Sequence, residues 1–321
     1  MEKEYLVVSF YHFISLENPE KEAKKLFTQM DSLSLKGRIY VSEEGVNAQF
    51  SGKKEQVKTF LEDLRKEPSY QDLFPKIQED TEPAFCKLQV KVRELVAFDQ
   101  KVDLENRGVH ISAKKWKEML ESKDEDTLLI DARNDYESSV GHFEGAILPP
   151  LENFRDFPEY TDKLLRDKDP TKTKVMMYCT GGIRCEYYSA YVKSKGFDKV
   201  YQLEGGIVQY GKEEGKKHWK GKLFVFDDRL VVPISEDNQE MISHCLHCKE
   251  PCDVYYNCAN MDCNELFIAC PTCIQKKRGC CCEECEKGRI RPFDPSNRPK
   301  PFRKWKKEEK QKLCSSSKKS S

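Results

Sequence analysis

The sequence lacks any hydrophobic run that could cross a membrane, because none approaches the roughly 18 apolar residues that a transmembrane helix needs. The first residues, MEKEYLVVSFYHF, include acidic Glu2 and Glu4 and no small-residue cleavage site, so we expect no secretory signal peptide. An excess of one charge is also missing, since 55 Lys and Arg balance 55 Asp and Glu. This excludes long-range attraction of an anionic partner by net charge. We therefore expect a cytoplasmic protein with no membrane partner.

Signatures of redox cofactors are absent as well. No glycine-rich dinucleotide fingerprint follows a predicted strand, and the six histidines provide no convincing two-histidine, one-carboxylate iron site. The sequence thus shows no flavin or haem motif. It has no internal repeat at the periods of solenoid proteins, so its 321 residues predict two or three different domains.

The first 92 residues alternate between strand and helix patterns. Residues 5–11 are rich in β-branched and aromatic side chains and predict a strand, whereas 19–33 carries apolar residues at helical spacing. The order βαββαβ predicts a ferredoxin-like α+β domain over residues 1–92. The other predicted elements are a hairpin of 37–41 with 45–50, a helix over 53–66, and strands near 76 and at 88–92.

A charged linker then leads into the pattern of a parallel sheet. A helix is expected over 112–122, with Ser112 as its N-cap and Trp116 on its buried face. This alternation predicts a central parallel-sheet α/β domain over residues 123–218. Its expected strands are the short apolar segments 127–130, 175–178 and 199–203, and a hairpin is expected within 223–232.

The most informative stretch is MMYCTGGIRCE, residues 176–186, which places Cys179 between a predicted strand and a predicted helix. Backbone N–H groups and the helix dipole favour an anion at that position, and Arg184 adds a positive charge. Both effects lower the pKa of a thiol, so we predict that Cys179 is a reactive thiolate and Arg184 its anion stabiliser. The alternative is a buried structural thiol beside a tight turn. The loop residues expected to curl around the sulfur are Thr180, Gly181, Gly182 and Ile183.

Other residues around this loop have more than one interpretation. Cys185 is either a resolving thiol, which releases a persulfide or sulfenate as a disulfide, or a residue packed beneath the helix. Four residues separate Cys179 from Arg184, one fewer than in protein tyrosine phosphatases, and a shorter loop encloses a smaller anion. We therefore do not expect phosphatase activity. His142 is predicted to be structural, and Asp131 and Arg133 are expected to form an ion pair that shapes the loop.

A cluster of cysteines follows, since eleven of the 15 lie between Cys245 and Cys285. In a reducing compartment such a cluster favours metal ligation over disulfides. Four cysteine pairs can form two interleaved tetrahedral zinc sites, so we predict a structural module with two zinc ions over residues 240–290. One site is assigned to Cys245, Cys248, Cys270 and Cys273, and the other to Cys258, Cys263, Cys285 and either Cys281 or Cys282, with Cys282 as our choice.

Although the net charge of the whole chain is zero, its C-terminal tail is basic. Residues 287–321 carry 13 Lys and Arg against 3 acidic residues, a local charge of +10. Phe293, Phe302 and Trp305 interleave with this charge, which suits phosphate contact and base stacking in RNA. We expect residues 291–321 to form a disordered tail that contacts nucleic acid, the alternative being a merely solvated one.

The motifs of the central domain resemble those of the rhodanese superfamily. Asp-Ala-Arg at 131–133, Glu137, the turn GHFEGA at 141–146, the Cys179 loop and Gly-Gly at 205–206 occur in that family's order. Rhodaneses carry sulfur as a cysteine persulfide. The resemblance therefore implies that a persulfide forms on Cys179.

Over nearly its whole length the chain is similar to the rhodanese-domain tRNA uridine hydroxylases, on the segments SEEGVNAQ at 42–49 and CTGGIRC at 179–185 and the cysteine-rich C-terminus. The similarity implies oxygen-dependent hydroxylation of the wobble uridine to 5-hydroxyuridine, with Cys179 as the functional cysteine. It also implies molecular oxygen as co-substrate and the anticodon region of tRNA as partner. The sequence identifies no electron or sulfur donor. The alternatives are a persulfide sulfurtransferase and a non-catalytic RNA-binding protein.

Overall fold

The computed structural model describes residues 2–237 and 240–292. The predicted basic tail, including Phe293, Phe302 and Trp305, therefore lies outside the described residues except for its first two positions. The chain divides into two compact units: one holds the residues up to Asp135 together with Gly145–His218, and the other holds Tyr136–Glu144 together with the residues from Trp219 on. No helix in the described part is both long enough and apolar enough to span a membrane.

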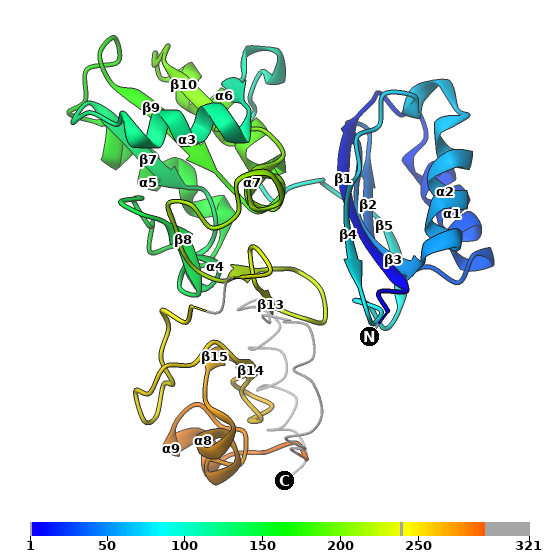
Figure 1. Ribbon diagram of the computed structural model, residues 1–321, viewed down its shortest axis with the longest axis vertical. Helices are drawn as coiled ribbons and strands as arrows, with labels where there is room; N and C mark the ends of the chain where they lie inside the picture. Colours follow the sequence, from blue (N-terminus) through cyan, green and yellow to red (C-terminus); the bar gives the residue numbers. More distant parts are fainter. Residues whose placement is uncertain (1, 238–239, 293–321) are drawn as a thin grey trace, which may run out of the picture. The chain divides into compact units, whose positions relative to one another are not determined.

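The first unit begins with a five-stranded sheet and two helices (Figure 1). The sheet has the order β4-β1-β3-β2-β5, and its neighbours are antiparallel except for the parallel pair β2 and β5. This confirms the predicted ferredoxin-like order, and the strand predicted at 88–92 is the edge strand beside β2. The elements are β1 (Tyr5–Phe13), α1 (Pro19–Ser32), β2 (Lys36–Ser42), β3 (Gly45–Lys53), α2 (Lys54–Arg65), β4 (Lys76–Asp80) and β5 (Leu88–Val92).

Helix α1 shows why the sequence folds in this way. The Asn18 side chain caps the helix by accepting a hydrogen bond of 2.8 Å from the N–H of Lys21. Pro19 occupies the first turn, where its missing N–H costs no helical hydrogen bond. Leu26 and Met30, one turn apart, are buried in the core that the helix shares with the sheet.

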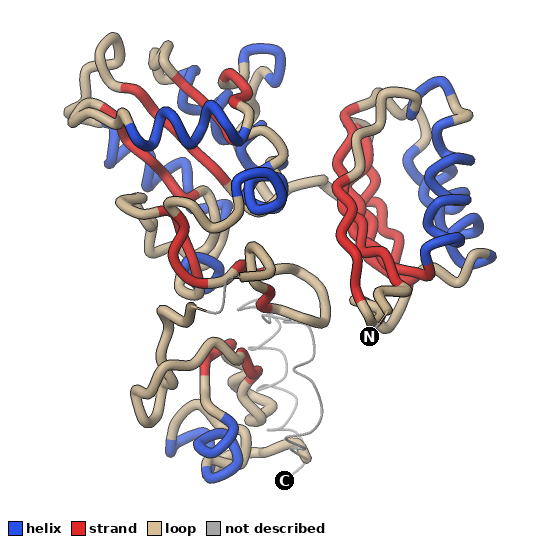
Figure 2. The backbone as a smooth tube through the Cα atoms, viewed as in Figure 1, coloured by secondary structure: helices blue, strands red, loops and turns tan. Residues whose placement is uncertain are grey.

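The first unit continues with a four-stranded parallel sheet of order β6-β10-β9-β7 (Figure 2). Its central strand β9 is apolar on both faces, as parallel strands covered on both sides must be. This confirms the predicted parallel-sheet domain and its three strands, and the sheet also includes β6, in the segment that the sequence assigned to a linker. The elements are β6 (Val109–Ile111), α3 (Ala113–Glu121), β7 (Thr127–Asp131), α5 (Phe157–Leu165), β9 (Lys174–Tyr178), α6 (Ile183–Ser194), β10 (Val200–Leu203) and α7 (Gly206–Glu214).

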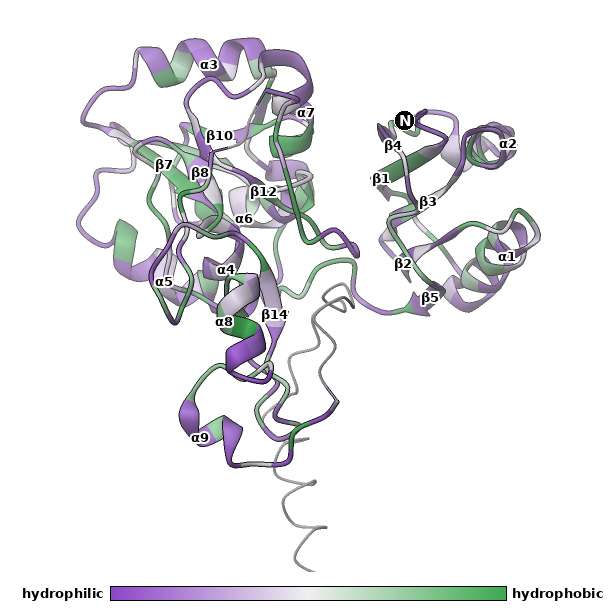
Figure 3. Ribbon diagram, turned by 60° about the horizontal axis from the view of Figure 1, so that its bottom comes forward, coloured by the Kyte–Doolittle hydropathy of each residue, from purple (hydrophilic) through white to green (hydrophobic). Residues whose placement is uncertain are grey.

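Helix α3 packs on α7, and α5 packs on α6. Helix α3 is largely hydrophilic in Figure 3, in keeping with its exposed side, while Trp116 on its other side is fully buried. Helix α6 is different, because nine of its residues are buried. A helix buried on most of its surface fixes its N-terminus firmly, and that terminus carries the Cys179 loop.

The second unit is built from short strand pairs. The predicted hairpin is present as β12 with β13, while the pairs β8 with β11 and β14 with β15 had no clear sequence signal. One of its buried clusters has ten buried residues, of which five are cysteines and few are aliphatic. The elements are α4 (Asp135–Ser138, which begins at the end of the first unit), β8 (Gly141–Phe143), β11 (Trp219–Gly221), β12 (Leu223–Phe224), β13 (Val231–Val232), β14 (Tyr255–Asn257), β15 (Leu266–Ile268), α8 (Pro271–Lys276) and α9 (Glu283–Glu286).

Candidate active site

The Cys179 loop connects β9 to α6, as the sequence predicted. Cys179 is 1% exposed, and its Sγ accepts a hydrogen bond of 3.1 Å from the N–H of Gly182. Gly182 caps α6 with φ of +102°, a conformation that residues with a side chain rarely adopt. The sulfur therefore lies at the positive end of a helix, within a loop that bends back to meet it.

The first residues of α7 donate backbone hydrogen bonds to this loop. The carbonyl of Cys179 accepts a hydrogen bond of 3.0 Å from the N–H of Ile207, and the carbonyl of Thr180 accepts one of 3.1 Å from Val208. Gly206 has φ of +68°, and a Cβ at this position would lie 2.6 Å from the Cys179 carbonyl oxygen. The close approach of the two backbones thus requires a glycine at 206.

We expect the substitution Gly206→Ala to reduce activity by displacing the Cys179 loop. Gly196→Ala is the matched control, because Gly196 also has positive φ, at +91°, but a Cβ there would meet nothing within 4 Å. Backbone strain should cost both variants about 1 kcal/mol of stability. Gly206→Ala should lose more, because its Cβ would also lie 2.6 Å from the Cys179 carbonyl oxygen. Thermal unfolding measures both losses. Only Gly206→Ala should also lose catalytic activity. Equal activity in the two variants would contradict a role of this contact in shaping the loop.

The electrostatics of the loop favour a thiolate on Cys179. Burial raises the pKa of this thiol, but the hydrogen bond from Cys185, the charge of Arg184 and the N–H of Gly182 outweigh it and lower the pKa to about 6. Burial, together with the neighbouring Cys179, raises the pKa of Cys185. Near neutral pH the pair therefore consists of a Cys179 thiolate and a Cys185 thiol that donates to it.

The other residues predicted around the loop occupy supporting positions. Arg184 is 9% exposed and has Nη2 3.5 Å from Thr180 Oγ1. The expected ion pair of Asp131 with Arg133 is present and fully buried, with 2.6 Å between Oδ2 and Nη2. In the second unit, Nδ1 of His142 lies 2.9 Å from the Ser138 carbonyl oxygen, a local contact that suits a structural residue.

Two residues of the N-terminal sheet also contact the loop, and the sequence did not predict them. Nζ of Lys76 donates a hydrogen bond of 2.7 Å to the Gly181 carbonyl and lies 4.9 Å from the centre of the Tyr11 ring. Burial lowers the pKa of Lys76 to about 8, although the charges of Cys179 and Glu186 act against this shift. The ferredoxin-like domain thus places a buried cation beside the Cys179 loop.

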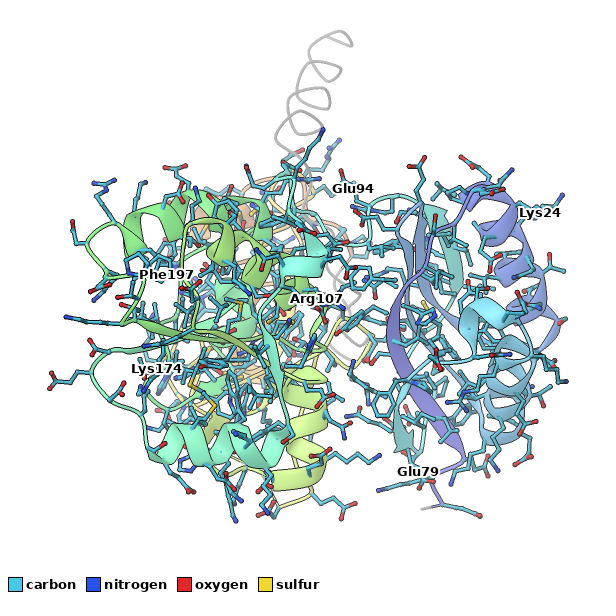
Figure 4. All side chains as sticks on the ribbon, turned by 90° about the horizontal axis from the view of Figure 1, so that it is seen from above. Lys24, Glu79, Glu94, Arg107, Lys174 and Phe197 are labelled. Atoms are coloured by element: carbon cyan, nitrogen blue, oxygen red, sulfur yellow. The ribbon has the colours of Figure 1, made fainter. Side chains whose placement is uncertain are left out.

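Glu186, directly after Cys185, organises this part of the unit. Its carboxylate is buried and accepts hydrogen bonds from Tyr11 Oη at 2.7 Å and from Gln202 Nε2 at 3.3 Å, and it lies 2.9 Å from His110 Nε2. Arg107, labelled in Figure 4, forms an ion pair with it at 3.3 Å. Burial raises the pKa of Glu186, but these neighbours, His110 and Tyr11 first, lower it overall. The sequence held one signal that could have identified Glu186, because a carboxylate within a helix that is otherwise buried needs partners for its charge.

Eight of the eleven cysteines in the described part of the second unit form two groups of four. In each group the four sulfur atoms lie within 4.8 Å of one another, and none of these cysteines forms a disulfide. Four thiolates at about 2.3 Å from a zinc ion lie about 3.8 Å apart along the edges of a tetrahedron. The measured separations of 3.8 Å for Cys248 with Cys270, 3.8 Å for Cys263 with Cys281 and 3.7 Å for Cys281 with Cys285 fit this geometry. The groups are Cys245, Cys248, Cys270 and Cys273, and Cys258, Cys263, Cys281 and Cys285.

One predicted member differs. Of the two neighbours that the spacing left open, the structure brings Cys281 into the second group and leaves Cys282, our choice, outside it. Cys282 is the N-cap of the short helix α9, whereas Cys281 precedes it. Adjacent residues point in different directions as the chain enters a helix, so only one of the two sulfurs can reach the group. Alternation of cysteine pairs between the groups is present, as expected for an interleaved module.

Comparison with known proteins accounts for most of the chain. Residues 5–96 match the UPF0176 acylphosphatase-like domain, 112–213 the rhodanese-like domain, and 220–286 the rhodanase C-terminal family. A tRNA uridine(34) hydroxylase of Chlamydia felis is 48% identical over 94% of this chain and 94% of its own length. One of Protochlamydia amoebophila is 46% identical over 94% and 95%. Among solved structures, a rhodanese-like domain from Anabaena has 21% identity and a TM-score of 0.29, over 35% of this chain and 78% of that one.

Proposed function

Since this chain belongs to the tRNA uridine(34) hydroxylase family, we propose that it hydroxylates the wobble uridine of tRNA at C5 to give 5-hydroxyuridine. The observation that carries the proposal is the Cys179 loop, whose buried sulfur has a pKa of about 6 and lies at the start of α6. Because its proposed substrate is tRNA, we also propose that the enzyme acts in the cytoplasm. Its proposed binding partner is the anticodon region of tRNA.

Each residue of the loop has a part in the proposed reaction. Cys179 acts as a thiolate or persulfide, and Arg184 with the N–H groups of residues 180–183 stabilises negative charge on its sulfur. Cys185, which donates a hydrogen bond to Cys179, is the resolving thiol. Molecular oxygen is the co-substrate. One of its atoms becomes the C5 hydroxyl and the other leaves as water, so two electrons and two protons must come from a donor.

The two cysteine groups of the second unit are proposed to hold two zinc ions. Their sulfur separations fit a tetrahedral ion, and four thiolates leave no position open for substrate. Zinc would therefore stabilise the fold and take no part in the chemistry. The basic residues after 291 are proposed to contact the tRNA backbone.

The function is tested by mass spectrometry of the nucleosides of tRNA from cells that lack this gene. We expect 5-hydroxyuridine and the nucleosides derived from it to disappear and to return when the wild-type gene is supplied. The strain must lack any second route to this nucleoside, because redundancy would mask the loss. Unchanged 5-hydroxyuridine in such a strain would refute the proposal.

A persulfide sulfurtransferase is the second candidate, because the same loop favours an anionic sulfur on Cys179. An assay of the purified protein with thiosulfate as donor and cyanide or a dithiol as acceptor, read together with the nucleoside analysis, separates the two functions. Sulfur transfer together with unchanged tRNA nucleosides would favour this candidate. A non-catalytic RNA-binding protein would instead bind tRNA, form neither product, and be indifferent to loss of Cys179.

A further inference from the structure

A cavity of about 420 Å³ lies in the first unit beside the Cys179 loop, within the range of about 300–1,000 Å³ that is typical of ligand pockets. We call it the Phe74 cavity. Tyr11, Phe74 and Lys76 contribute to its wall from the ferredoxin-like domain, and His110 and Glu204 contribute from the central domain. Neither domain forms this cavity alone.

The wall of the cavity is shared with the reactive loop. Lys76 lines the cavity and donates to the Gly181 carbonyl at 2.7 Å. Tyr11 also lines it, and a Cβ on Gly182 would lie 2.9 Å from the Tyr11 hydroxyl. Two side chains of the cavity wall, Tyr11 and Lys76, therefore also lie against the loop of Cys179.

The charge of the lining indicates which kind of molecule fits. Three exposed carboxylates, those of Asp72, Glu204 and Glu213, line the cavity together with one buried cation, Lys76, and two histidines, His12 and His110. This excess of negative charge disfavours an anion such as phosphate or thiosulfate. An uncharged ring with both kinds of hydrogen-bonding group suits the lining, because carboxylates accept from a ring N–H and an ammonium donates to a ring carbonyl. Uracil has one such N–H and two carbonyls.

Phe74 adds a surface for stacking. Its side chain is 69% exposed although it is aromatic and lies at a cavity, and burying such a ring against a partner would be favourable. Aromatic side chains stack on the unpaired bases of RNA whatever the base. Exposure of Phe74 at this place thus points to a nucleobase as the missing partner.

We propose that the Phe74 cavity receives the uracil base of uridine 34, turned out of the anticodon loop and stacked on Phe74, while Lys76 holds a ring carbonyl beside the Cys179 loop. The inference rests on the proposed function and assigns its substrate to one place. Enzymes that modify a base generally turn it out of its stack, at a cost that is smallest for an already unpaired base. The ferredoxin-like domain then has a defined role as one wall of the substrate site.

The first test compares Phe74→Ala with Phe27→Ala, an exposed phenylalanine on α1 that is 44% exposed and does not line the cavity. Binding of an anticodon stem–loop RNA with uridine at position 34 is measured by fluorescence anisotropy. Phe74→Ala should weaken binding roughly ten- to hundredfold, the range for loss of one stacked base, and Phe27→Ala should leave it unchanged. Equal affinity of Phe74→Ala and wild type would overturn the proposal.

The second test locates the base directly. The same RNA carrying 4-thiouridine at position 34 is irradiated with the full-length protein, and the attached peptides are identified by mass spectrometry. Attachment to peptides that contain Tyr11 or Phe74 supports the proposal, and attachment only elsewhere overturns it. The proposed function fails separately, if cells expressing the wild type form no 5-hydroxyuridine. Normal hydroxylation by Phe74→Ala in such cells would leave the function intact and refute this cavity as its site.

Discussion

Cys179→Ser is expected to lower the formation of 5-hydroxyuridine by about 10³-fold or more, the scale on which loss of a nucleophile acts. A serine hydroxyl does not ionise near neutral pH, so the anion that the loop stabilises would be lost while the size of the side chain is kept. The measurement is the amount of 5-hydroxyuridine in tRNA from cells that express only the variant. Cys86→Ser is the matched control, because Cys86 is an exposed thiol distant from the loop in sequence. Wild-type levels with Cys179→Ser would contradict the proposed chemistry.

The same argument predicts how the rate depends on pH. The Cys179 thiolate is present above its pKa of about 6 and is lost as the pH falls below it. The Lys76 ammonium is present below its pKa of about 8 and is lost as the pH rises above it. The rate should therefore be greatest between about pH 6 and pH 8 and should fall on either side. Because Cys179 and Lys76 interact, the apparent pKa values of the acid and alkaline limbs describe the pair rather than either residue alone. Arg184→Ala should move the acid limb upward, because the guanidinium lowers the pKa of the thiol. An acid limb unmoved in that variant would contradict the assignment.

Removal of metal is expected to unfold the second unit and leave the first unit folded. Half of the buried residues in the cluster around the two cysteine groups are cysteines, so few aliphatic contacts would remain there without an ion. Structural zinc contributes about 10–16 kcal/mol in small zinc-dependent domains, more than the whole stability of many proteins. Elemental analysis of the purified protein should find two zinc ions per chain. Limited proteolysis after chelation should cut the second unit first, and a proteolysis pattern unchanged by chelation would contradict a structural role for zinc.

The adjacent residues Cys281 and Cys282 provide a control for the prediction of two zinc ions, because only Cys281 belongs to a group. Cys281→Ser and Cys258→Ser should each reduce the zinc content to one ion per chain, since both residues belong to the second group. Cys282→Ser should retain both ions, because Cys282 lies outside it. If Cys282→Ser lost zinc while Cys281→Ser kept it, the original choice from spacing would be restored.

Local patterns in the sequence were sufficient for much of the fold. Alternating and helical periodicities predicted the ferredoxin-like order and the strands of the parallel sheet. They could do so because a strand or helix that buries one face repeats apolar residues within a short segment of sequence. Strand β6 had too little of this signal, since two of its three residues are exposed. It joins the sheet through pairing with β10, a partner that lies about 90 residues later in the chain.

The geometry of the Cys179 loop was determined by the sequence itself, because its cysteine, glycines and arginine lie within six consecutive residues and local geometry brings them together. Only the tertiary structure decided between Cys281 and Cys282. Only it placed Tyr11 and Lys76 against the loop and His110 beside Glu186. A single lysine at the start of a strand has no distinguishing pattern. The pKa of Lys76 is set by its burial and by the charges of Cys179 and Glu186, which lie more than 100 residues away in the sequence. Both effects depend on how the chain packs.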